Sequence, residues 1–121
     1  MSVLHPDDVK TLKLPGRNIK FVVTQKTCGI KNMNGGITEI GVKSQLPEHS
    51  HDIQEEAMYF IKGKGEAVLN GKGANVNPGD IFYAPAGEIH TVRNIGNEAL
   101  AFFFLFSPQI DTSSYEKQDI G

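Results

Sequence analysis

The chain has little of what a membrane-bound or secreted protein needs. Its one cysteine, Cys28, cannot form a disulfide within the chain. The longest apolar run, residues 99–106, has eight residues, whereas a transmembrane helix needs about 20. The first residues, Met-Ser-Val-Leu-His, lack the basic and apolar regions of a signal peptide. We therefore expect a cytoplasmic protein without a membrane anchor.

Clusters of basic residues are also missing. The 12 lysines and arginines are scattered among 14 acidic residues, which gives a formal net charge of -2. A nucleic-acid-binding surface needs positive charge gathered on one face or along one stretch of chain. The composition therefore argues against DNA or RNA as a partner. A chain of 121 residues is expected to form one domain with a single core.

Glycine and proline are plentiful and regularly spaced. Thirteen glycines and six prolines separate short β-branched or aromatic segments, which is typical of an all-β sandwich or barrel. No long helical pattern is present. The dipeptide Asn70-Gly71 predicts a two-residue type I′ hairpin turn. The expected strands are residues 19–24, 37–42, 57–61, 66–69, 74–76, 81–84, 90–93 and 99–106.

Histidines and acids are concentrated in the segment PEHSHDIQEEAMYF, residues 47–60. Side chains alternate along an extended chain, so His49 and His51 project from the same face if this segment is extended. Such a pair suits a transition-metal site, but it also occurs on an ordinary polar loop. A metal site needs a further ligand, and His90 follows the Pro-Ala-Gly turn at residues 85–87. These residues alone leave both interpretations open.

The spacing around these histidines resembles the two sequence motifs of the cupin family. The first family motif is glycine, five residues, His-x-His, three or four residues, Glu, six residues and glycine. The chain matches it at His49, His51, Glu56 and Gly63. The leading glycine, Gly41, is separated from His49 by seven residues instead of five, which predicts a bulge or a longer loop there.

The second family motif is matched at every position. It consists of glycine, five residues, Pro-x-Gly, two residues, His, three residues and Asn. The matching residues are Gly79, Pro85, Gly87, His90 and Asn94. The 15 residues between the two motifs leave room for the hairpin at Asn70-Gly71 and little more.

This resemblance implies an all-β fold, a single-domain jelly-roll barrel with a metal site inside. Four side chains would point inward and bind one divalent metal: His49, His51, Glu56 and His90. Glu56 is preferred to Glu55 because six residues separate it from Gly63, as in the family motif. Neutral imidazoles and one carboxylate suit iron, manganese, nickel, copper or zinc, and they do not select among these metals.

The resemblance also implies how the chain is organised. Residues 37–107 form the barrel core, residues 1–36 form an N-terminal segment with a flanking strand, and residues 108–121 form a C-terminal tail, all within one domain. The tail is polar, and no chemistry is predicted for it. The family further implies a homodimer in which strand 19–24 pairs with the neighbouring subunit's sheet.

The ligand set implies a small-molecule metalloenzyme of dioxygenase, decarboxylase, isomerase or lyase type. No catalytic residue beyond the metal ligands is predicted, because alternation along the strands points Tyr59 outward. Arg17 and Arg93 are the only arginines, and Arg93 is also expected to point outward, so no clamp for a phosphate is predicted. The alternative is a cupin that binds a metal and a small ligand without turnover, for sensing or storage.

Overall fold

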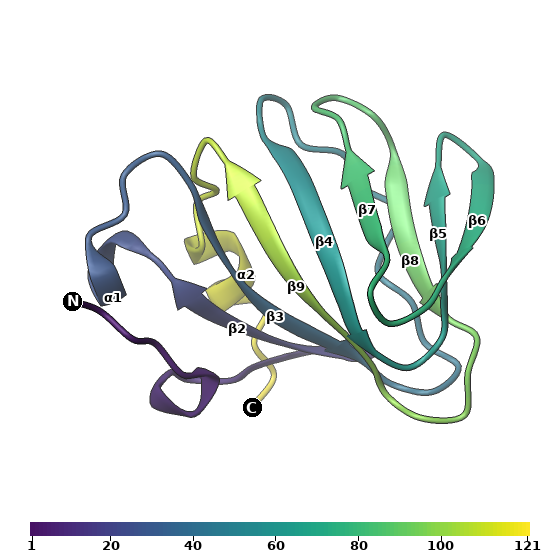
Figure 1. Cartoon of the computed structure of the whole chain (residues 1–121), viewed down its shortest axis with the longest axis horizontal. Coiled ribbons are helices and arrows are strands. Elements are labelled where there is room, and N and C mark those ends of the chain that lie inside the picture. The colour runs from purple at the N-terminus through teal and green to yellow at the C-terminus, as the bar shows by residue number, and fades with distance from the viewer.

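The computed structural model describes all residues from 1 to 121 and consists mainly of two antiparallel β-sheets (Figure 1). The strands are β1 (Leu12–Leu14), β2 (Arg17–Val23), β3 (Asn34–Ile40), β4 (Glu55–Lys62), β5 (Gly65–Leu69), β6 (Lys72–Val76), β7 (Ile81–Ala84), β8 (His90–Asn94) and β9 (Leu100–Ser107). The helical segments are η1 (Pro6–Asp8), α1 (Gln25–Cys28) and α2 (Ser113–Lys117). No helix has the length and hydrophobicity needed to cross a membrane.

The two sheets face each other and enclose one core. The larger sheet has the strand order β1-β2-β3-β9-β4-β7, and the smaller has the order β6-β5-β8. Single bridges from Gln45 to Arg93 and from His49 to His90 attach the segment between β3 and β4 to the free side of β8. The expected jelly-roll barrel is therefore confirmed, and this connecting segment takes the place of a further strand.

The alternation of side chains along β4 places Glu56, one of the predicted metal ligands, on the inner face of the strand. Glu56, Met58 and Phe60 are buried, while Tyr59 is 48% exposed on the outer face. Each buried residue lies opposite a phenylalanine of β9, with Glu56 paired to Phe106. The inner face of this one strand therefore changes from a carboxylate to apolar side chains along its length.

Close packing fills the barrel at the apolar end of β4. Five side chains there have 0% exposure: Ile40, Met58, Phe60, Val92 and Leu100. Asn94, the last residue of the second motif, is also buried, and its amide donates hydrogen bonds to the carbonyls of Ile40 and Glu98. This amide thereby satisfies two backbone groups that would otherwise lie buried without partners.

The hairpin between β5 and β6 turns where the sequence predicts it. Asn70 has φ 49° and Gly71 has φ 81°. Positive φ at both central residues is what a type I′ turn requires, and asparagine and glycine adopt it most readily. The predicted turn is therefore confirmed.

The N-terminal region differs from the expectation. A short strand, β1, precedes β2 and pairs with it through a tight turn at Pro15 and Gly16, where Gly16 has φ 75°. β2 consequently lies between β1 and β3, but β1 pairs only with residues 17–19 of β2. The expected pairing of strand 19–24 with a neighbouring subunit stays a prediction, because residues 20–23 of β2 have no partner strand on the β1 side.

The C-terminal tail is attached to the N-terminal part of the sheet. The backbone N–H of Ile120 donates to the carbonyl of Lys13 at 2.8 Å, and the N–H of Lys13 donates to Asp119 at 2.9 Å. Asn34 and Ile110 exchange two hydrogen bonds, each of 2.9 Å. The tail is therefore an ordered part of the barrel, and α2 lies beside β2 and β3 (Figure 1).

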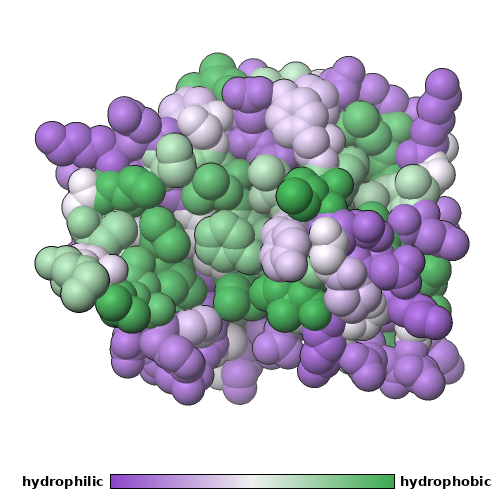
Figure 2. Space-filling model, viewed as in Figure 1, coloured by the Kyte–Doolittle hydropathy of each residue, from purple (hydrophilic) through white to green (hydrophobic).

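The outer face of the larger sheet is partly apolar. Hydrophobic side chains form a band across the face that Figure 2 shows, with polar residues around it. The exposed large side chains on β4 and β7 are Tyr59, Ile61, Ile81 and Tyr83. Contiguous apolar surface of this kind is common where another protein binds.

Candidate metal centre

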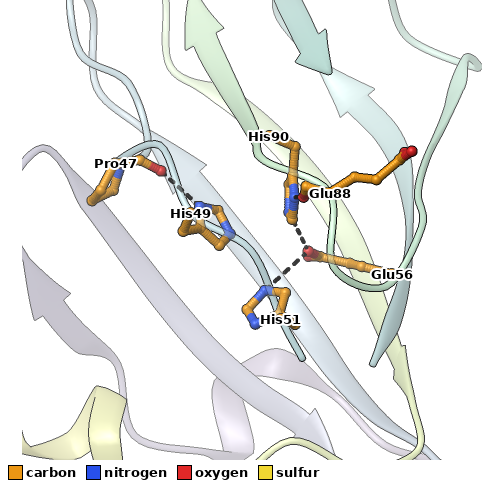
Figure 3. A network of polar contacts seen from close by, with 6 residues as sticks. All are labelled: Pro47, His49, His51, Glu56, Glu88 and His90. Carbon is orange, nitrogen blue, oxygen red and sulfur yellow. Dashed lines mark hydrogen bonds and ion pairs between the residues drawn. The ribbon is translucent and has the colours of Figure 1, made fainter. Parts of the chain in front are cut away.

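Three separate parts of the chain bring the predicted ligands together (Figure 3). His49 and His51 lie on the segment between β3 and β4, Glu56 lies on β4, and His90 begins β8. One ligand atom from each of the four side chains lies within 4.8 Å of the other three. The structure thus places all four predicted residues in one cluster inside the barrel.

A backbone bridge holds two of the histidines side by side. The N–H of His49 donates to the carbonyl of His90 at 3.1 Å, and the N–H of His90 donates to the carbonyl of His49 at 2.8 Å. Their ring centroids are 4.2 Å apart. The N–H of Gly87 also donates to the carbonyl of His51 at 2.7 Å. These bonds explain how a segment without regular strand structure positions its histidines accurately.

Backbone carbonyls orient two of the rings. Nδ1 of His49 lies 2.6 Å from the carbonyl oxygen of Pro47, and Nδ1 of His90 lies 3.1 Å from that of Glu88. Because a carbonyl only accepts, each Nδ1 carries the proton and donates it. This leaves Nε2 of each ring directed into the cluster, which is the arrangement that metal-binding histidines use.

His51 supplies the clearest sign that the cluster fits a metal ion. Its Nε2 is buried and has no hydrogen-bond partner. The nearest carboxylate oxygen, from Glu56, is 3.8 Å away. A buried polar atom without a partner destabilises a protein, so native structures rarely contain one without a reason. A cation among these four ligands would provide the missing partner.

Glu56 and His90 form a buried polar pair. Nε2 of His90 lies 3.2 Å from Oε1 of Glu56, which is 5% exposed. Burial raises the pKa of Glu56, and the hydrogen bond and charge of His90 partly offset this. Burial also acts to lower the pKa of His90, but its bonds to Glu56 and to the Glu88 carbonyl outweigh this and raise it. Since both pKa values are raised, the pair without metal holds a proton between the imidazole and the carboxyl group.

The other two histidines favour the neutral form. Burial is the largest cause, and together with the neighbouring histidines it lowers the pKa of His51 to about 4. The pKa of His49 is also lowered, mainly by burial and further by the charges of His90 and Arg17, against the Pro47 hydrogen bond. Two of the three imidazoles are thus unprotonated near neutral pH, as metal binding requires.

A cavity of about 320 Å³ adjoins the cluster, with His49, His51 and Glu56 in its wall. Its other walls are largely apolar: Ile19, Phe21, Phe102, Phe104, Phe106 and Ile110. Polar side chains also line it, among them Arg17 from β2 and Tyr115 from α2. The cavity is within the usual size range of small-molecule sites, about 300 to 1,000 Å³.

Arg17 and Tyr115 are the cavity residues that the sequence analysis missed. The expectation that Arg93 points outward holds, because Arg93 is exposed beside buried Val92, whereas no direction was predicted for Arg17, which lines the cavity. Arg17 and Ile19 are two residues apart on β2, so alternation from an apolar inward position could have revealed it. No local signal marks Tyr115, because its position depends on how the tail docks.

Two residues near the cluster lie outside it. Glu55 follows the expectation and faces solvent, where it accepts a hydrogen bond of 2.5 Å from the hydroxyl of Tyr83. This bond is the main cause that raises the pKa of Tyr83, whose side chain is on the outer face. Neither residue contributes to the interior site.

The fold and the cluster define a small jelly-roll protein with an interior site able to hold a metal ion. A family model for the cupin domain matches residues 36–106, and the chain belongs to the cupin family. Solved structures agree on the fold. KdgF from a Halomonas species superposes with a TM-score of 0.79 at 22% identity, covering 93% of this chain and 98% of that one.

Proteins from Thermotoga maritima are also similar. The structure of a predicted oxalate decarboxylase from that organism has a TM-score of 0.77 at 20% identity, covering 88% of this chain and 99% of the other. An oxalate-binding protein from the same organism is 35% identical over 59 residues, which are 49% of this chain and 49% of the relative. The matched stretch therefore spans about half the length of that relative.

Proposed function

We propose that the protein binds one divalent transition metal through His49, His51, Glu56 and His90 and acts on a small oxygenated molecule in the adjoining cavity. The observation that carries this proposal is the buried, unpartnered Nε2 of His51 inside a cluster of ligand atoms within 4.8 Å of one another. Three imidazoles and one carboxylate suit iron, manganese, nickel, copper or zinc.

The ligand set determines what chemistry is available. When bound, such a metal supplies Lewis-acid chemistry or, if it is redox-active, dioxygen chemistry, which corresponds to reactions of dioxygenase, decarboxylase, isomerase or lyase type. The chain's own residues orient and enclose the substrate. Phe102, Phe104 and Phe106 keep water from one wall of the cavity. Burial raises the pKa of Tyr115 to about 12, so its hydroxyl keeps its proton and can donate a hydrogen bond to a substrate oxygen.

A second candidate is a protein that holds a metal and a small ligand without turnover. The supporting observation is that the cavity offers no independent acid or base poised near neutral pH. Its titratable lining residues outside the cluster are Arg17 and Tyr115. The similarity to an oxalate-binding protein also favours this candidate and suggests small carboxylates as ligands.

Elemental analysis of untagged protein tests the metal site. The wild type should contain about one transition-metal ion per chain, and a His49→Ala, His51→Ala double variant should contain almost none. His5→Ala is the matched control, because His5 is an exposed histidine near the N-terminus and outside the cluster. Equal metal content in the wild type and the double variant would show that the site assignment is wrong.

Turnover assays separate the enzyme from the binding protein. Oxygen uptake with diols and hydroxylated aromatics reports dioxygenase chemistry, and carbon dioxide release from small dicarboxylates reports decarboxylation. Activity that depends on His49 and His51 supports the enzyme. Tight ligand binding without turnover across the whole panel supports the binding protein instead.

We also propose that the protein is a cytoplasmic homodimer, as the family resemblance implies. The apolar outer face of β4 and β7 supports dimerisation, and the single cysteine is compatible with a reducing compartment. Light scattering in solution tests the oligomeric state, because a dimer has twice the chain mass of 13.2 kDa. A particle with the mass of one chain would contradict the proposed dimer.

A further inference from the structure

We propose that Arg17 is an anion-binding residue of the cavity, which recognises a carboxylate on a small organic acid whose other end reaches the metal cluster. Only the contact between the ligand and the metal cluster rests on the proposed function, and the contact with Arg17 does not. Arg17 shares the cavity with His49, His51 and Glu56, so one small molecule can contact both groups. The proposed ligand is therefore an acid with at least two oxygen-bearing ends.

Arg17 lacks the partners that a partly buried guanidinium normally has. It forms no ion pair in the protein, although six other pairs do form. Its one hydrogen bond runs from Nη1 to the carbonyl of Pro15 at 3.3 Å. A guanidinium has five N–H donors in a planar fork, so most of its donors have no acceptor in the protein. A ligand carboxylate would satisfy two of them at once.

The second arginine shows what a purely structural arginine looks like in this chain. Arg93 lies on the exposed side of β8 and forms an ion pair with Glu66 on the neighbouring strand β5. Its charge is thus compensated by the protein itself. The contrast is that Arg17, which faces the cavity, has no such carboxylate.

The charges in the cavity favour an anion at the arginine end. The only acid in the cavity wall is Glu56, which is already bonded to His90. Arg17 remains charged in proteins at neutral pH, so the cavity carries one positive charge without a counterion.

The remaining wall indicates what lies between the two ends of the ligand. No lysine lines the cavity, and eight of its 17 lining residues are hydrophobic. One guanidinium balances a singly charged carboxylate, whereas the cavity has no second arginine or lysine to balance a doubly charged phosphate. Phe21, Phe104 and Tyr115 stack edge to face beside it, which provides a surface for a hydrocarbon or ring. The chemistry therefore fits an organic acid with an apolar middle.

Isothermal calorimetry with matched probes tests this inference. The probes are the linear dicarboxylates from malonate to adipate and the monoamide of each, which differ only in the charge at one end. For at least one length, the diacid should bind wild-type protein about tenfold more tightly than its monoamide. In Arg17→Gln this ratio should fall to about one, and Arg17→Lys should restore it in part because it restores the charge without the fork.

Controls separate a direct contact from a loss of structure. Arg93→Gln removes the paired arginine on the outside and should leave the diacid-to-monoamide ratio at its wild-type value. Arg17→Gln should melt at nearly the wild-type temperature and keep its metal content. A merely structural role for Arg17 would weaken the binding of diacids and monoamides equally, and this result would overturn the inference.

The same titrations distinguish this inference from the proposed function. A ratio that is unchanged in Arg17→Gln, or near one at every length in the wild type, overturns the inference and leaves the metal site unaffected. A wild type that contains no metal contradicts the proposed function. In that case the affinity of each diacid for the metal-free wild type, compared with its affinity for Arg17→Gln, decides the role of Arg17, because one carboxylate is enough to contact the guanidinium.

Discussion

The two ends of the barrel interior are built by the same strands and have opposite character. Along the inner face of β4, Glu56 lies in the polar cluster, whereas Phe60 lies among side chains with no exposure. The packed end consists of apolar residues that fill their space. The cluster end contains a buried carboxylate, an unpartnered His51 nitrogen and the cavity. The packed end therefore stabilises the fold, and the cluster end gives up stability for binding.

This difference has a physical cause. Burying apolar surface stabilises a protein by about 25 cal/mol per Å². Burying a charge or a polar atom without a partner destabilises it, and the penalty is recovered when a ligand supplies the partner. The comparison therefore predicts that substitutions at the packed end act on stability and that substitutions at the cluster end act on binding.

The largest effect on stability is expected from Phe60→Ala at the packed end. Phe60 is fully buried against Phe102, with ring centroids 5.3 Å apart. Removing the ring should lower the free energy of unfolding by about 3 to 5 kcal/mol, measured by urea denaturation of metal-free protein. The metal content of the folded protein should not change. A loss of metal with unchanged stability would contradict the proposed division between the two ends.

A pH-dependent effect is expected at the cluster end. In the folded protein the pKa of His51 is about 4, against an ordinary value of 6.5. Between pH 4 and pH 6.5 His51 is protonated in the unfolded chain but not in the folded protein. The contribution of His51 to the free energy of unfolding is therefore fully present above pH 6.5 and is lost as the pH falls toward 4. This contribution is about 3 kcal/mol.

The variant His51→Gln isolates that contribution, because glutamine is polar but does not titrate. Urea denaturation of metal-free wild type and variant between pH 4 and 8 should show a shallower decline with acid in the variant. The other histidines and Glu56 titrate in both proteins, so the difference between the two curves is the quantity to compare. Parallel curves would show that His51 titrates normally in the fold.

Glu56→Gln is expected to change stability much less. The amide keeps an acceptor for His90, whose Nε2 lies 3.2 Å from Oε1, and it removes a carboxylate whose pKa is raised by burial. These effects oppose each other, so the metal-free variant should unfold within about 1 kcal/mol of the wild type. Metal affinity should fall at least tenfold, as measured by competition with a chelator. A large loss of stability without a loss of metal would show that Glu56 stabilises the fold and does not bind the metal.

The smallest effect is expected outside the barrel. Arg93→Gln removes a solvent-exposed ion pair with Glu66 on neighbouring strands. Exposed pairs contribute about 0 to 1 kcal/mol, so the urea midpoint should hardly move. A change as large as that of Phe60→Ala would contradict the comparison, because it would show that the outer face of the smaller sheet stabilises the fold as much as the packed interior does.

The cluster could be predicted from sequence because its members are defined locally. The spacing from His49 to Glu56 fits one segment and one strand, and the turn before His90 marks the start of another. Alternation also predicts correctly that Tyr59 and Arg93 face outward. In each case the relevant geometry extends over only a few residues.

The far wall of the cavity could not be predicted in the same way. Tyr115 reaches the cavity because hydrogen bonds from Asp119 and Ile120 attach the tail to Lys13, more than 100 positions earlier in the chain. Such pairing leaves no periodic pattern in either segment. Strand β1 was missed for a related reason, since three residues are too short to show a convincing alternation.

The attachment of the tail to the first strand has an evolutionary consequence. The candidate metal ligands lie on the two cupin motifs, whereas part of the remaining cavity wall comes from β2 and from the C-terminal tail. Replacing, lengthening or redocking α2 would reshape that wall while the four ligands stay in place. Sequence changes in the terminal segments of related proteins would therefore change which small molecule the cavity binds, while the four metal-binding residues stay the same.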